Sequence, residues 1–398
     1  MTNYAIAGAG LEGKIAFKYF SKLGHCQYFD EKKVEFNNFD KIPDTWTVIR
    51  SPGIPLYKFK SNLTIWSSTN EFFAKCPAPI IGVTGTKGKG TVCTMTTKIL
   101  ENAGYKVHLV GNIGIPALSV LDKIKPHNIV IFELSSFQLW DLKYSPYISV
   151  ILPITSEHLD VHKNFTEYWQ AKANIAKFQK STDYIIYNPN NKIVNQIGNL
   201  SIAKKITYNN KTTITFKLQA PGKHNIIDAN IAAIISKTYD KTITAKTIKS
   251  SLRQFTSLPH RLQFIKTVKG VNIYDDNFSS NFLSLKVALE AFPNNNISLI
   301  CGGYDRGLNN ETDIASVINN STVKFVALIG QTAQKIAEKL TKDHIICQSL
   351  SQAVNLTFKQ SKKSDILLMS PGAASFDMFD NFYQRGFLFQ KLIGELNS

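Results

Sequence analysis

A glycine-rich segment, residues 82–92 with the sequence GVTGTKGKGTV, constrains the fold of this chain more than any other feature. It follows the apolar run Ile80 to Val83, which suits a buried strand, and precedes Thr91 to Gly104, which suits a helix. A strand, a glycine turn and a helix in this order direct backbone N–H groups and the helix dipole at phosphate oxygens. The segment therefore predicts a nucleotide-binding loop in a parallel α/β sheet, and the alternative is a turn that binds nothing.

The spacing of this loop departs from the usual phosphate-binding pattern, G-x-x-x-x-G-K-[ST]. Counting back from Lys89, the first glycine position holds Val83, and the position after the lysine, where a hydroxyl residue is usual, holds Gly90. We expect Lys89 to meet the β- and γ-phosphates of a bound nucleotide. Thr91 is the only hydroxyl residue immediately after this lysine that could reach Mg²⁺, so we expect it to take that position.

A second glycine turn lies near the N-terminus, where Gly8 to Gly13 (GAGLEG) follow the short strand Tyr4 to Ala7. Asp30 stands at the end of the next expected strand, as in dinucleotide-binding units. This pattern favours a bound dinucleotide or a related nucleotide. The alternative is a glycine turn that only lets the first helix pack closely on the sheet.

Strands and helices are expected to alternate again from about residue 257. We predict three α/β domains: a Rossmann-like domain over residues 1–78, a central ATPase-type parallel-sheet domain over 79–256, and a C-terminal Rossmann-like domain over 257–398. A linker at Cys76 to Pro79 separates the first two. Other expected strands are Ile129–Glu133, Tyr147–Leu152, Ile297–Cys301, Phe325–Ile329 and Ile366–Met369, and other expected helices are Thr166–Gln179, Leu283–Ala291, Ala333–Leu340 and Phe376–Glu395.

Composition narrows the possible classes of protein. The chain has 398 residues, of which 43% are hydrophobic and 11% aromatic, as is typical of a globular protein of two or three domains. No apolar run reaches the roughly 18 residues that span a bilayer, and no signal peptide is recognisable, so we expect no membrane partner. The five cysteines are scattered without a C-x-x-C pair, which favours reduced thiols and a cytoplasmic location.

The net charge of +17 is spread along the chain and does not form a basic stripe. We therefore expect no nucleic-acid partner, although the charge favours anions such as nucleotides and phosphorylated sugars. Arginine is scarce, so each arginine is informative, because lysine does not replace the guanidinium group where two parallel contacts are needed. The arginines are Arg50, Arg253, Arg261, Arg306 and Arg385.

Further motifs extend nearly from end to end and, together with the loop T-G-T-x-G-K-x-T, resemble the Mur ligase superfamily of ATP-dependent amide ligases. They are SPGI (51–54), GNIGIP (111–116), ELSSFQL (133–139), EHLD (157–160) with Tyr168 to Lys172, GKHN (222–225), LPHRL (258–262), GGYDRG (302–307) and SPGAASFDMFDNF (370–382). The segments 133–139 and 370–379 most resemble the branch that joins D-glutamate to UDP-N-acetylmuramoyl-L-alanine. Gly90 and Thr91 resemble the folylpolyglutamate branch, which has no N-terminal glycine-turn domain.

The resemblance implies a reaction and its participants. A carboxylate of UDP-N-acetylmuramoyl-L-alanine attacks the γ-phosphate of ATP, and the amine of glutamate then attacks the acyl phosphate, giving an amide, ADP and phosphate in peptidoglycan precursor synthesis. ATP and Mg²⁺ are the expected cofactors, the two small molecules are the expected partners, and the enzyme is expected to be a cytoplasmic monomer. The N-terminal glycine turn would hold a uridine diphosphate.

The resemblance also implies site residues, position by position. Lys89, His158, Lys172 and Arg306 are the expected catalytic residues, and Thr91, Glu133, His158 and Lys172 are expected around the metal. ATP is expected to contact Gly85, Thr86, Lys87, Gly88, Lys89, Gly90, Thr91, Asn225, Arg261 and Asp276. The UDP-sugar or the acceptor amino acid is expected to contact Gly10, Leu11, Asp30, Ser51, Asn112, Ser135, Gln138, Ser280, Ser375 and Phe382.

Some of these residues have simpler structural explanations. Glu133 could be only a charge at a strand end, and Lys172 could be a solvated lysine on a helix, whereas the resemblance implies that Lys172 is carbamylated. His158 and His162 stand four residues apart, which could suggest zinc, but no further strong ligand cluster completes such a site. Arg385 could form only local pairs.

The acceptor site is where this chain departs most from the family. Many D-glutamate ligases carry D-S-K-A-T at the start of the third domain, whereas residues 276–280 read DNFSS, so Phe278 replaces the lysine. An aromatic ring cannot neutralise a carboxylate, so we expect Arg306 to do so, with Ser375 and the Phe382 backbone fixing the side-chain carboxylate. Glutamate remains the predicted acceptor, D rather than L. The alternatives are a ligase for L-glutamate or folate polyglutamylation, and an NAD(P)-dependent oxidoreductase.

Overall fold

A computed structural model describes residues 2–113, 115–209, 214–307 and 311–396, and its contacts divide the chain into two compact units. The first unit is Met1–Ile214 with Asp228–Leu252, and the second is Thr215–Ile227 with Arg253–Ser398. Gly114 of the expected GNIGIP motif lies outside the described residues, as do Met1 and residues 397–398 at the ends of the first and third expected domains. The predicted domain boundaries stay a prediction.

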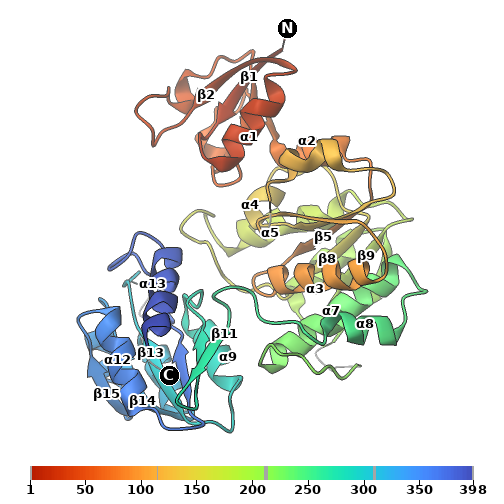
Figure 1. Ribbon diagram of the computed structural model, residues 1–398. Coiled ribbons are helices and arrows are strands. Elements are labelled where there is room, and N and C mark those ends of the chain that lie inside the picture. Colours follow the sequence, from red (N-terminus) through yellow and green to blue (C-terminus); the bar gives the residue numbers. More distant parts are fainter. Residues whose placement is uncertain (1, 114, 210–213, 308–310, 397–398) are drawn as a thin grey trace. The chain divides into compact units, whose positions relative to one another are not determined.

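The first unit contains a four-stranded parallel sheet with strand order β2-β1-β3-β4 (Figure 1). A Cβ atom on Gly13 would lie 1.7 Å from the carbonyl oxygen of Gly8, so only glycine lets α1 approach the first turn this closely. The elements are β1 (Thr2–Ala7), α1 (Leu11–Phe20), β2 (Gly24–Phe29), η1 (Phe39–Lys41), β3 (Thr47–Arg50), η2 (Leu56–Lys58), β4 (Thr64–Ser67) and α2 (Ser68–Lys75).

The same unit contains a six-stranded parallel sheet with strand order β10-β9-β8-β5-β7-β6. Its strands are β5 (Ile80–Thr84), β6 (Val107–Gly111), β7 (Ile129–Glu133), β8 (Ile148–Ile151), β9 (Tyr184–Tyr187) and β10 (Lys204–Thr207). Its helices are α3 (Lys89–Asn102), η3 (Ala117–Lys123), α4 (Ser136–Leu139), α5 (Phe165–Lys177), α6 (Lys192–Leu200), α7 (Lys223–Tyr239) and α8 (Ala245–Leu252). The first turn of α7, residues 223–227, belongs to the second unit.

Helices α3 and α5 lie on opposite faces of this sheet (Figure 1). Strands β5, β7 and β8 are buried along their whole length, which is why their sequences are apolar runs without alternation. The strand order reverses at β5, whose neighbours are β7 on one side and β8 on the other. Ligands of open parallel sheets bind at the carboxyl ends of strands at such a reversal. The phosphate loop follows β5 at this position.

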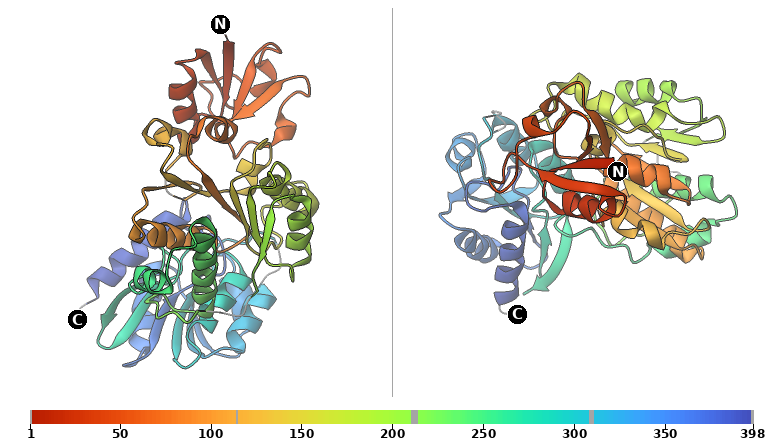
Figure 2. Two further views of the ribbon diagram at one scale, coloured as in Figure 1. Left: turned by 90° about the vertical axis from the view of Figure 1, so that its right-hand side faces the viewer. Right: turned by 90° about the horizontal axis from the view of Figure 1, so that it is seen from above.

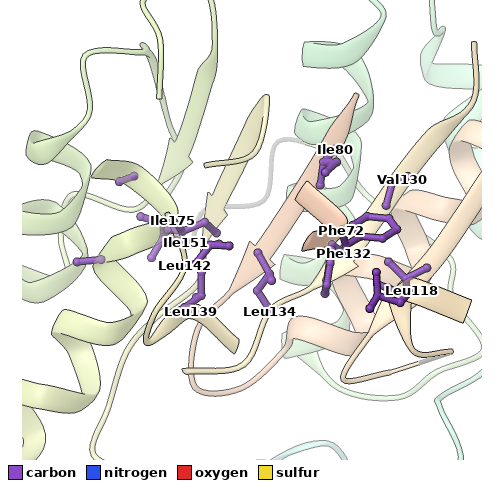
Figure 3. Close-up of a cluster of buried hydrophobic side chains, with 14 of the residues drawn as sticks. Phe72, Ile80, Leu118, Val130, Phe132, Leu134, Leu139, Leu142, Ile151 and Ile175 are labelled. Carbon is purple, nitrogen blue, oxygen red and sulfur yellow. The ribbon is translucent and has the colours of Figure 1, made fainter. Parts of the chain in front are cut away.

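One hydrophobic cluster packs between α2, η3 and the six-stranded sheet (Figure 3). Phe72 of α2 meets Phe132 of β7 with ring centroids 5.5 Å apart and nearly perpendicular planes. Leu118 of η3 and Val130 of β7 belong to the same cluster. This packing, which buries the face of β7 that carries Val130 and Phe132, stabilises the strand that has Glu133 at its end.

The second unit contains a six-stranded sheet with strand order β11-β12-β16-β13-β14-β15, flanked by helices (Figure 2). Its strands are β11 (Gln263–Val268), β12 (Val271–Asp275), β13 (Ile297–Cys301), β14 (Val323–Leu328), β15 (Asp343–Ile346) and β16 (Ile366–Met369). Its helices are α9 (Phe282–Glu290), α10 (Glu311–Asn319), α11 (Ala333–Ala337), α12 (Leu350–Gln360) and α13 (Phe382–Glu395).

This sheet is parallel except for its edge, where β11 and β12 form an antiparallel hairpin. Lys269 and Gly270 connect these strands with φ angles of 49° and 81°. Two-residue hairpin turns favour positive φ at both positions because this backbone matches the twist of the strands. The prediction of a C-terminal Rossmann-like domain did not include this antiparallel hairpin at the edge of the sheet.

Two expected helices differ from the observed ones by more than two residues at one end. Helix α13 begins at Phe382 and not at Phe376, because the Asn381 side chain accepts a hydrogen bond from the Gln384 backbone N–H at 3.0 Å and caps the helix. Helix α11 ends at Ala337, and only residues 338–339 continue as a turn. The expected strands Ile129–Glu133, Ile297–Cys301 and Ile366–Met369 are present with these bounds. Among the described residues, no helix is both long and apolar enough to cross a membrane.

Candidate active site

The glycine-rich loop joins β5 to α3, as its sequence predicts. Gly85 and Gly88 have φ angles of 149° and 84°, which side chains other than glycine rarely allow. A Cβ atom on Gly85 would lie 2.6 Å from Cβ of Leu152, so the loop also packs closely against the residue after β8. Gly88 is the N-cap of α3, and the backbone N–H groups of the first turn that follows are suited to bind an anion.

The side chains of the loop are held in place by hydrogen bonds. The Lys89 ammonium donates to the carbonyl oxygens of Gly85 and Thr86, each at 3.1 Å, so the lysine lies over its own loop. The Thr86 hydroxyl donates to the carbonyl oxygen of Thr155 at 3.0 Å. Lys87 is exposed and pairs with Glu157 at 2.7 Å. The loop thus combines backbone N–H groups with the positive charges of Lys87 and Lys89, which is the combination that a polyphosphate site requires.

Glu133 ends β7 beside Val83 of β5 and is 3% exposed. Asn112, which follows β6, donates its side-chain N–H to a Glu133 carboxylate oxygen at 3.1 Å and its backbone N–H to the Glu133 carbonyl. Thr91 is half-buried in the first turn of α3. A buried carboxylate near a phosphate loop fits Mg²⁺, which takes one or two carboxylates and completes its shell with water and phosphate oxygens. Asn112 therefore orients the candidate carboxylate.

Lys172 of α5 is 1% exposed, so the solvated-lysine alternative is wrong. Its ammonium donates to the Gly85 carbonyl oxygen at 3.0 Å and to the Thr84 hydroxyl at 3.4 Å, and it lies 4.8 Å from the centroid of the Tyr168 ring. Burial, followed by the nearby charge of Lys89, lowers the pKa of Lys172 well below the ordinary value for lysine. A lysine in this environment is readily neutral and therefore nucleophilic.

The two histidines of the 158–162 segment have different surroundings. His158 has a φ angle of 58°, and its ring nitrogen lies 3.8 Å from Glu157. His162 is buried, its Nε2 lies 3.0 Å from the Ser136 hydroxyl, and its ring stacks on Phe137 with centroids 5.2 Å apart. No group of three or more His, Cys, Asp or Glu side chains arranged for a metal exists in the part of the chain that the structure describes. The zinc interpretation therefore gains no support.

The N-terminal glycine turn is braced by Asp30. The Asp30 carboxylate accepts hydrogen bonds from the backbone N–H groups of Ala9 and Lys32, both at 2.8 Å. Gly10 is the exposed N-cap of α1, and Leu11 is 67% exposed, so the start of this helix is accessible to a ligand. Asp30 therefore shapes the turn, whatever else it contacts.

Arg50 and the motif residues after it form a buried junction within the first unit. Arg50 is fully buried, and its guanidinium donates to the carbonyl oxygens of Pro52 and Ile54, each at 2.9 Å, to that of Phe137 at 2.7 Å, and to Asp141 at 2.5 Å. These bonds tie the turn after β3 to the α4 segment. No role was assigned to Arg50 in the sequence analysis. The only feature of the sequence that indicated its importance was the scarcity of arginine.

Three expected substrate residues of the first unit make hydrogen bonds within that unit. The Ser135 hydroxyl accepts from the Gln138 backbone N–H at 3.2 Å, and the Gln138 side chain accepts from the Ser135 backbone N–H at 3.0 Å. This pair is a capping box that starts α4 directly after Glu133 and Leu134. The Ser51 hydroxyl lies 3.5 Å from the Gly8 carbonyl oxygen. The structure thus gives Ser135 and Gln138 a structural role, and a substrate contact remains a prediction.

In the second unit, two of the expected ATP contacts, Arg261 and Asp276, lie near the end of β12. Asp276 is buried, and its carboxylate accepts hydrogen bonds from the Ser370 hydroxyl at 2.7 Å and the Leu262 backbone N–H at 3.1 Å. Burial raises the pKa of Asp276 to about 7. Arg261 is half-buried beside it. Asn225, also buried, donates its side-chain N–H to the Pro221 carbonyl oxygen at 2.6 Å.

The expected acceptor residues lie in loops at the carboxyl ends of β12, β13 and β16. Ser280 precedes α9, Ser375 is buried in the loop after β16, and Phe382 begins α13. Arg306 is exposed on the loop after β13, where Tyr304 bridges to Ala374 of the β16 loop. Carboxyl ends of parallel strands meet at one edge of a sheet, so the fold places these residues at one edge of the second unit.

Arg385 forms hydrogen bonds to residues far from it in the sequence, in addition to the local pairs considered in the sequence analysis. This 1% exposed guanidinium donates to the Asn277 side-chain oxygen at 2.6 Å and to the carbonyl oxygens of Asn277, Ala373 and Ala374, each at 3.2 Å. The Asn277 side chain in turn donates to the Phe382 carbonyl oxygen. Arg385 therefore joins α13 to the loops that follow β12 and β16, which are the loops of the expected acceptor site.

Comparisons with known proteins agree with this geometry. Residues 83–243 match the Mur ligase middle domain, and residues 260–372 match the Mur ligase, glutamate ligase domain. A UDP-N-acetylmuramoylalanine–D-glutamate ligase of Clostridium kluyveri is 33% identical over 392 residues, which is 91% of this chain and 84% of that protein. The enzyme of the same name from Clostridium botulinum is 30% identical over 447 residues, covering 98% and 96% of the two chains.

Solved structures show the same fold. The UDP-N-acetylmuramate–alanine ligase MurC of Thermotoga maritima superimposes with a TM-score of 0.63 over 99% of both chains at 15% identity. FolC of Escherichia coli in complex with ADP superimposes with a TM-score of 0.62 over 82% of this chain and 92% of its own at 16% identity. The chain belongs to the Mur ligase family and is an ATP-dependent ligase with the three-domain α/β fold of that family. The oxidoreductase alternative has no support.

Proposed function

We propose that the chain adds D-glutamate to UDP-N-acetylmuramoyl-L-alanine in peptidoglycan precursor synthesis, forming an amide, ADP and phosphate through an acyl phosphate. The observation that best supports an acyl-phosphate ligase is the contact between Lys172 and the phosphate loop, next to the strand that ends in Glu133. Relatives that are 30–33% identical over most of the chain carry the name of this activity.

ATP would lie with its phosphates on the loop between β5 and α3. Lys89 would neutralise charge on the β- and γ-phosphates, and the backbone N–H groups after Gly88 would bind phosphate oxygens. Thr91 and Glu133 would hold Mg²⁺, with His158 near a second metal position, and the metal would withdraw charge from the phosphates. Positioning and charge neutralisation supply most of the catalysis in such a transfer.

Lys172 would act as a carbamate. Its buried, neutral amine can attack CO₂, forming an N–C bond and releasing one proton to solvent, so a neutral amine becomes a carbamate anion. Burial in contact with Gly85, Thr84 and Tyr168 would fix the new carboxylate beside the loop. The carbamate would then complete the charge balance around metal and phosphate.

The first substrate would bind through its uridine diphosphate at the N-terminal glycine turn. The start of α1 is exposed at Gly10 and Leu11, and helix N-termini stabilise phosphate groups. Asp30 would keep this turn in shape through its bond to Ala9. Ser51, Asn112, Ser135 and Gln138 would line the path of the muramoyl-alanine portion.

The second substrate would be a glutamate bound by the second unit. Ser280, Ser375 and the Phe382 backbone would contact its carboxylates, and Arg306 would supply positive charge. Arg306→Ala is expected to abolish the use of glutamate while ATP binding persists. Arg253→Ala is the matched control, because Arg253 is an exposed arginine of the same unit outside the motifs.

Phosphate release measured with ATP, UDP-N-acetylmuramoyl-L-alanine and D-glutamate tests the proposal. We expect release to require all three compounds and the product mass to equal the sum of the sugar nucleotide and glutamate less one water. Lys89→Ala is expected to abolish release, while Lys98→Ala, which changes an exposed lysine of the same helix, is expected to retain it. Turnover with a folate substrate and none with the UDP-sugar would favour the folate branch, which the Gly90–Thr91 spacing resembles.

A further inference from the structure

Phe278 forms a stack with Arg261 at the end of β12. The guanidinium carbon of Arg261 lies 4.1 Å from the centroid of the Phe278 ring, within the roughly 6 Å at which a cation is attracted to an aromatic face. The Phe278 ring also meets Phe382, with centroids 4.5 Å apart and planes at 70°. The ring is thus fixed by Phe382 and lies under the guanidinium.

The backbone around Arg261 is also held in an unusual shape. Its neighbours His260 and Leu262 have φ angles of 59° and 47°, in the left-handed region that residues other than glycine rarely adopt. Such conformations persist where the surrounding structure imposes them, and they cluster at functional sites. Arg261 therefore stands between two constrained residues.

Residues 275–278 impose this shape. Asp275 pairs with the buried His260 ring at 2.7 Å, Asp276 accepts a hydrogen bond from the Leu262 backbone N–H, and the Phe278 backbone N–H donates to the His260 carbonyl oxygen at 3.0 Å. The same short segment thus anchors both neighbours of Arg261 and provides the ring beneath its side chain.

The donors of the Arg261 guanidinium are not used by the residues that the structure describes. No carboxylate or carbonyl group of the described residues accepts a hydrogen bond from them, and none of these carboxylates forms an ion pair with Arg261 within 4.0 Å. Arg385, by contrast, donates four hydrogen bonds to the protein and is buried. A half-buried guanidinium that is held by its backbone and by a ring, with free donors, is ready to bind an oxyanion.

We propose that Phe278 is a positioning residue, which holds the Arg261 guanidinium for an oxyanion of a substrate at the carboxyl end of β12. This inference rests on the proposed ligase function. The oxyanion is a phosphate of the nucleotide or a carboxylate of the acceptor, which a guanidinium binds with the same paired contacts. Position 278 thus contributes to charge recognition through Arg261, although its own side chain is uncharged.

A double-mutant cycle tests this role. Phe278→Leu, Phe278→Tyr, Arg261→Ala and the double variant Phe278→Leu/Arg261→Ala are compared by KM for ATP, KM for glutamate and kcat, and by calorimetric titration with ADP. Phe278→Leu is expected to raise one of the two KM values by about 3- to 30-fold, the range of a lost cation–π contact. Phe278→Tyr keeps the aromatic face and is expected to stay near wild type.

The double variant is expected to match Arg261→Ala, because the ring acts only through the guanidinium. A rise in KM for ATP, with weaker ADP binding, identifies a phosphate as the oxyanion, and a rise in KM for glutamate alone identifies the acceptor carboxylate. Phe278→Leu with both KM values unchanged, or with the same fold effect in the Arg261→Ala background, overturns the proposal. Phe278→Met is a second apolar replacement should the leucine variant not fold.

The two proposals fail in different ways. If the wild-type enzyme ligates an amino acid other than glutamate, the acceptor assignment is wrong. The double-mutant cycle is then evaluated with the KM for that amino acid in place of the KM for glutamate. If Phe278→Leu lowers only the thermal midpoint, the ring is structural and the positioning role is wrong, while the ligase function stands.

Discussion

The side-chain nitrogen of Lys172 lies 3.0 Å from the carbonyl oxygen of Gly85, so a buried lysine of α5 is attached to the phosphate loop. Lys89, the lysine of the loop itself, donates to the same carbonyl oxygen at 3.1 Å. Burial, and after it the charge of Lys89 on the same acceptor, favour the neutral form of Lys172 and lower its pKa well below the ordinary value for lysine. This relationship leads to the first prediction.

Lys172→Ala is expected to lower the ligase rate by about 10- to 100-fold, the usual effect of losing a group that supports a metal site. Added short carboxylic acids are expected to restore part of the rate, because a small carboxylate can occupy the space of the carbamate. Phosphate release measures both effects. Lys177→Ala, which changes an exposed lysine on the same helix, is the control. Full activity in Lys172→Ala would remove the carbamate from the mechanism.

Thr91→Ala is expected to raise the Mg²⁺ concentration for half-maximal activity by about 10- to 100-fold, because the loop then lacks its hydroxyl ligand. Thr91→Ser keeps the hydroxyl and should behave like the wild type. Thr94→Ala, one helical turn further along α3, is the matched control. An unchanged Mg²⁺ titration in Thr91→Ala would show that the metal is held without this residue.

The buried ion pair between Arg50 and Asp141 predicts a large effect on stability. Asp141→Asn removes the charge that faces a fully buried guanidinium and is expected to lower the free energy of unfolding by about 3–5 kcal/mol. Denaturant unfolding followed by tryptophan fluorescence measures the loss. Lys60→Ala breaks an exposed pair with Asp44 in the same unit and should leave the midpoint unchanged. Equal midpoints for both variants would contradict the structural role of Arg50.

The buried His162 ring predicts a dependence of stability on pH. Burial lowers its pKa from the ordinary 6.5 to about 4, against a smaller opposing effect of Glu167. The unfolded chain therefore binds more protons at this position between pH 6.5 and about 4, so stability falls as the pH is lowered through this window. Urea midpoints at pH 7 and pH 5 should differ less in His162→Gln than in the wild type. The exposed His127→Gln is the control, and equal slopes in His162→Gln and wild type would contradict the prediction.

Local sequence patterns predicted the elements that carry the candidate nucleotide site. The runs at Ile80 and Ile129 are apolar throughout, because both faces of the central sheet are covered, and their ends placed the loop and Glu133 correctly. The start of α13 was missed, because apolar residues continue upstream of Asn381 and only the cap marks the boundary. Element ends depend on such single hydrogen bonds more than on composition.

Side-chain partners far apart in the sequence could not be predicted. Arg50 meets Asp141 across 91 residues, and Arg385 meets Asn277 across 108. The pairing of Phe278 with Arg261 likewise depends on the β11–β12 hairpin, whose turn at Lys269 and Gly270 brings the two segments together. Scarcity of arginine pointed to the importance of these residues, but their partners became known only from the fold.

Acceptor specificity is the most direct test of the proposed reaction. Phosphate release is measured with ATP and UDP-N-acetylmuramoyl-L-alanine while the amino acid is varied over D-glutamate, L-glutamate, D-glutamine, glycine and L-alanine. D-Glutamate is expected to give the highest kcat/KM, and D-glutamine is expected to lose roughly 10- to 150-fold, since a charge-assisted contact contributes about 1.5–3 kcal/mol. A higher kcat/KM for an uncharged amino acid than for either glutamate would contradict the assignment of the acceptor.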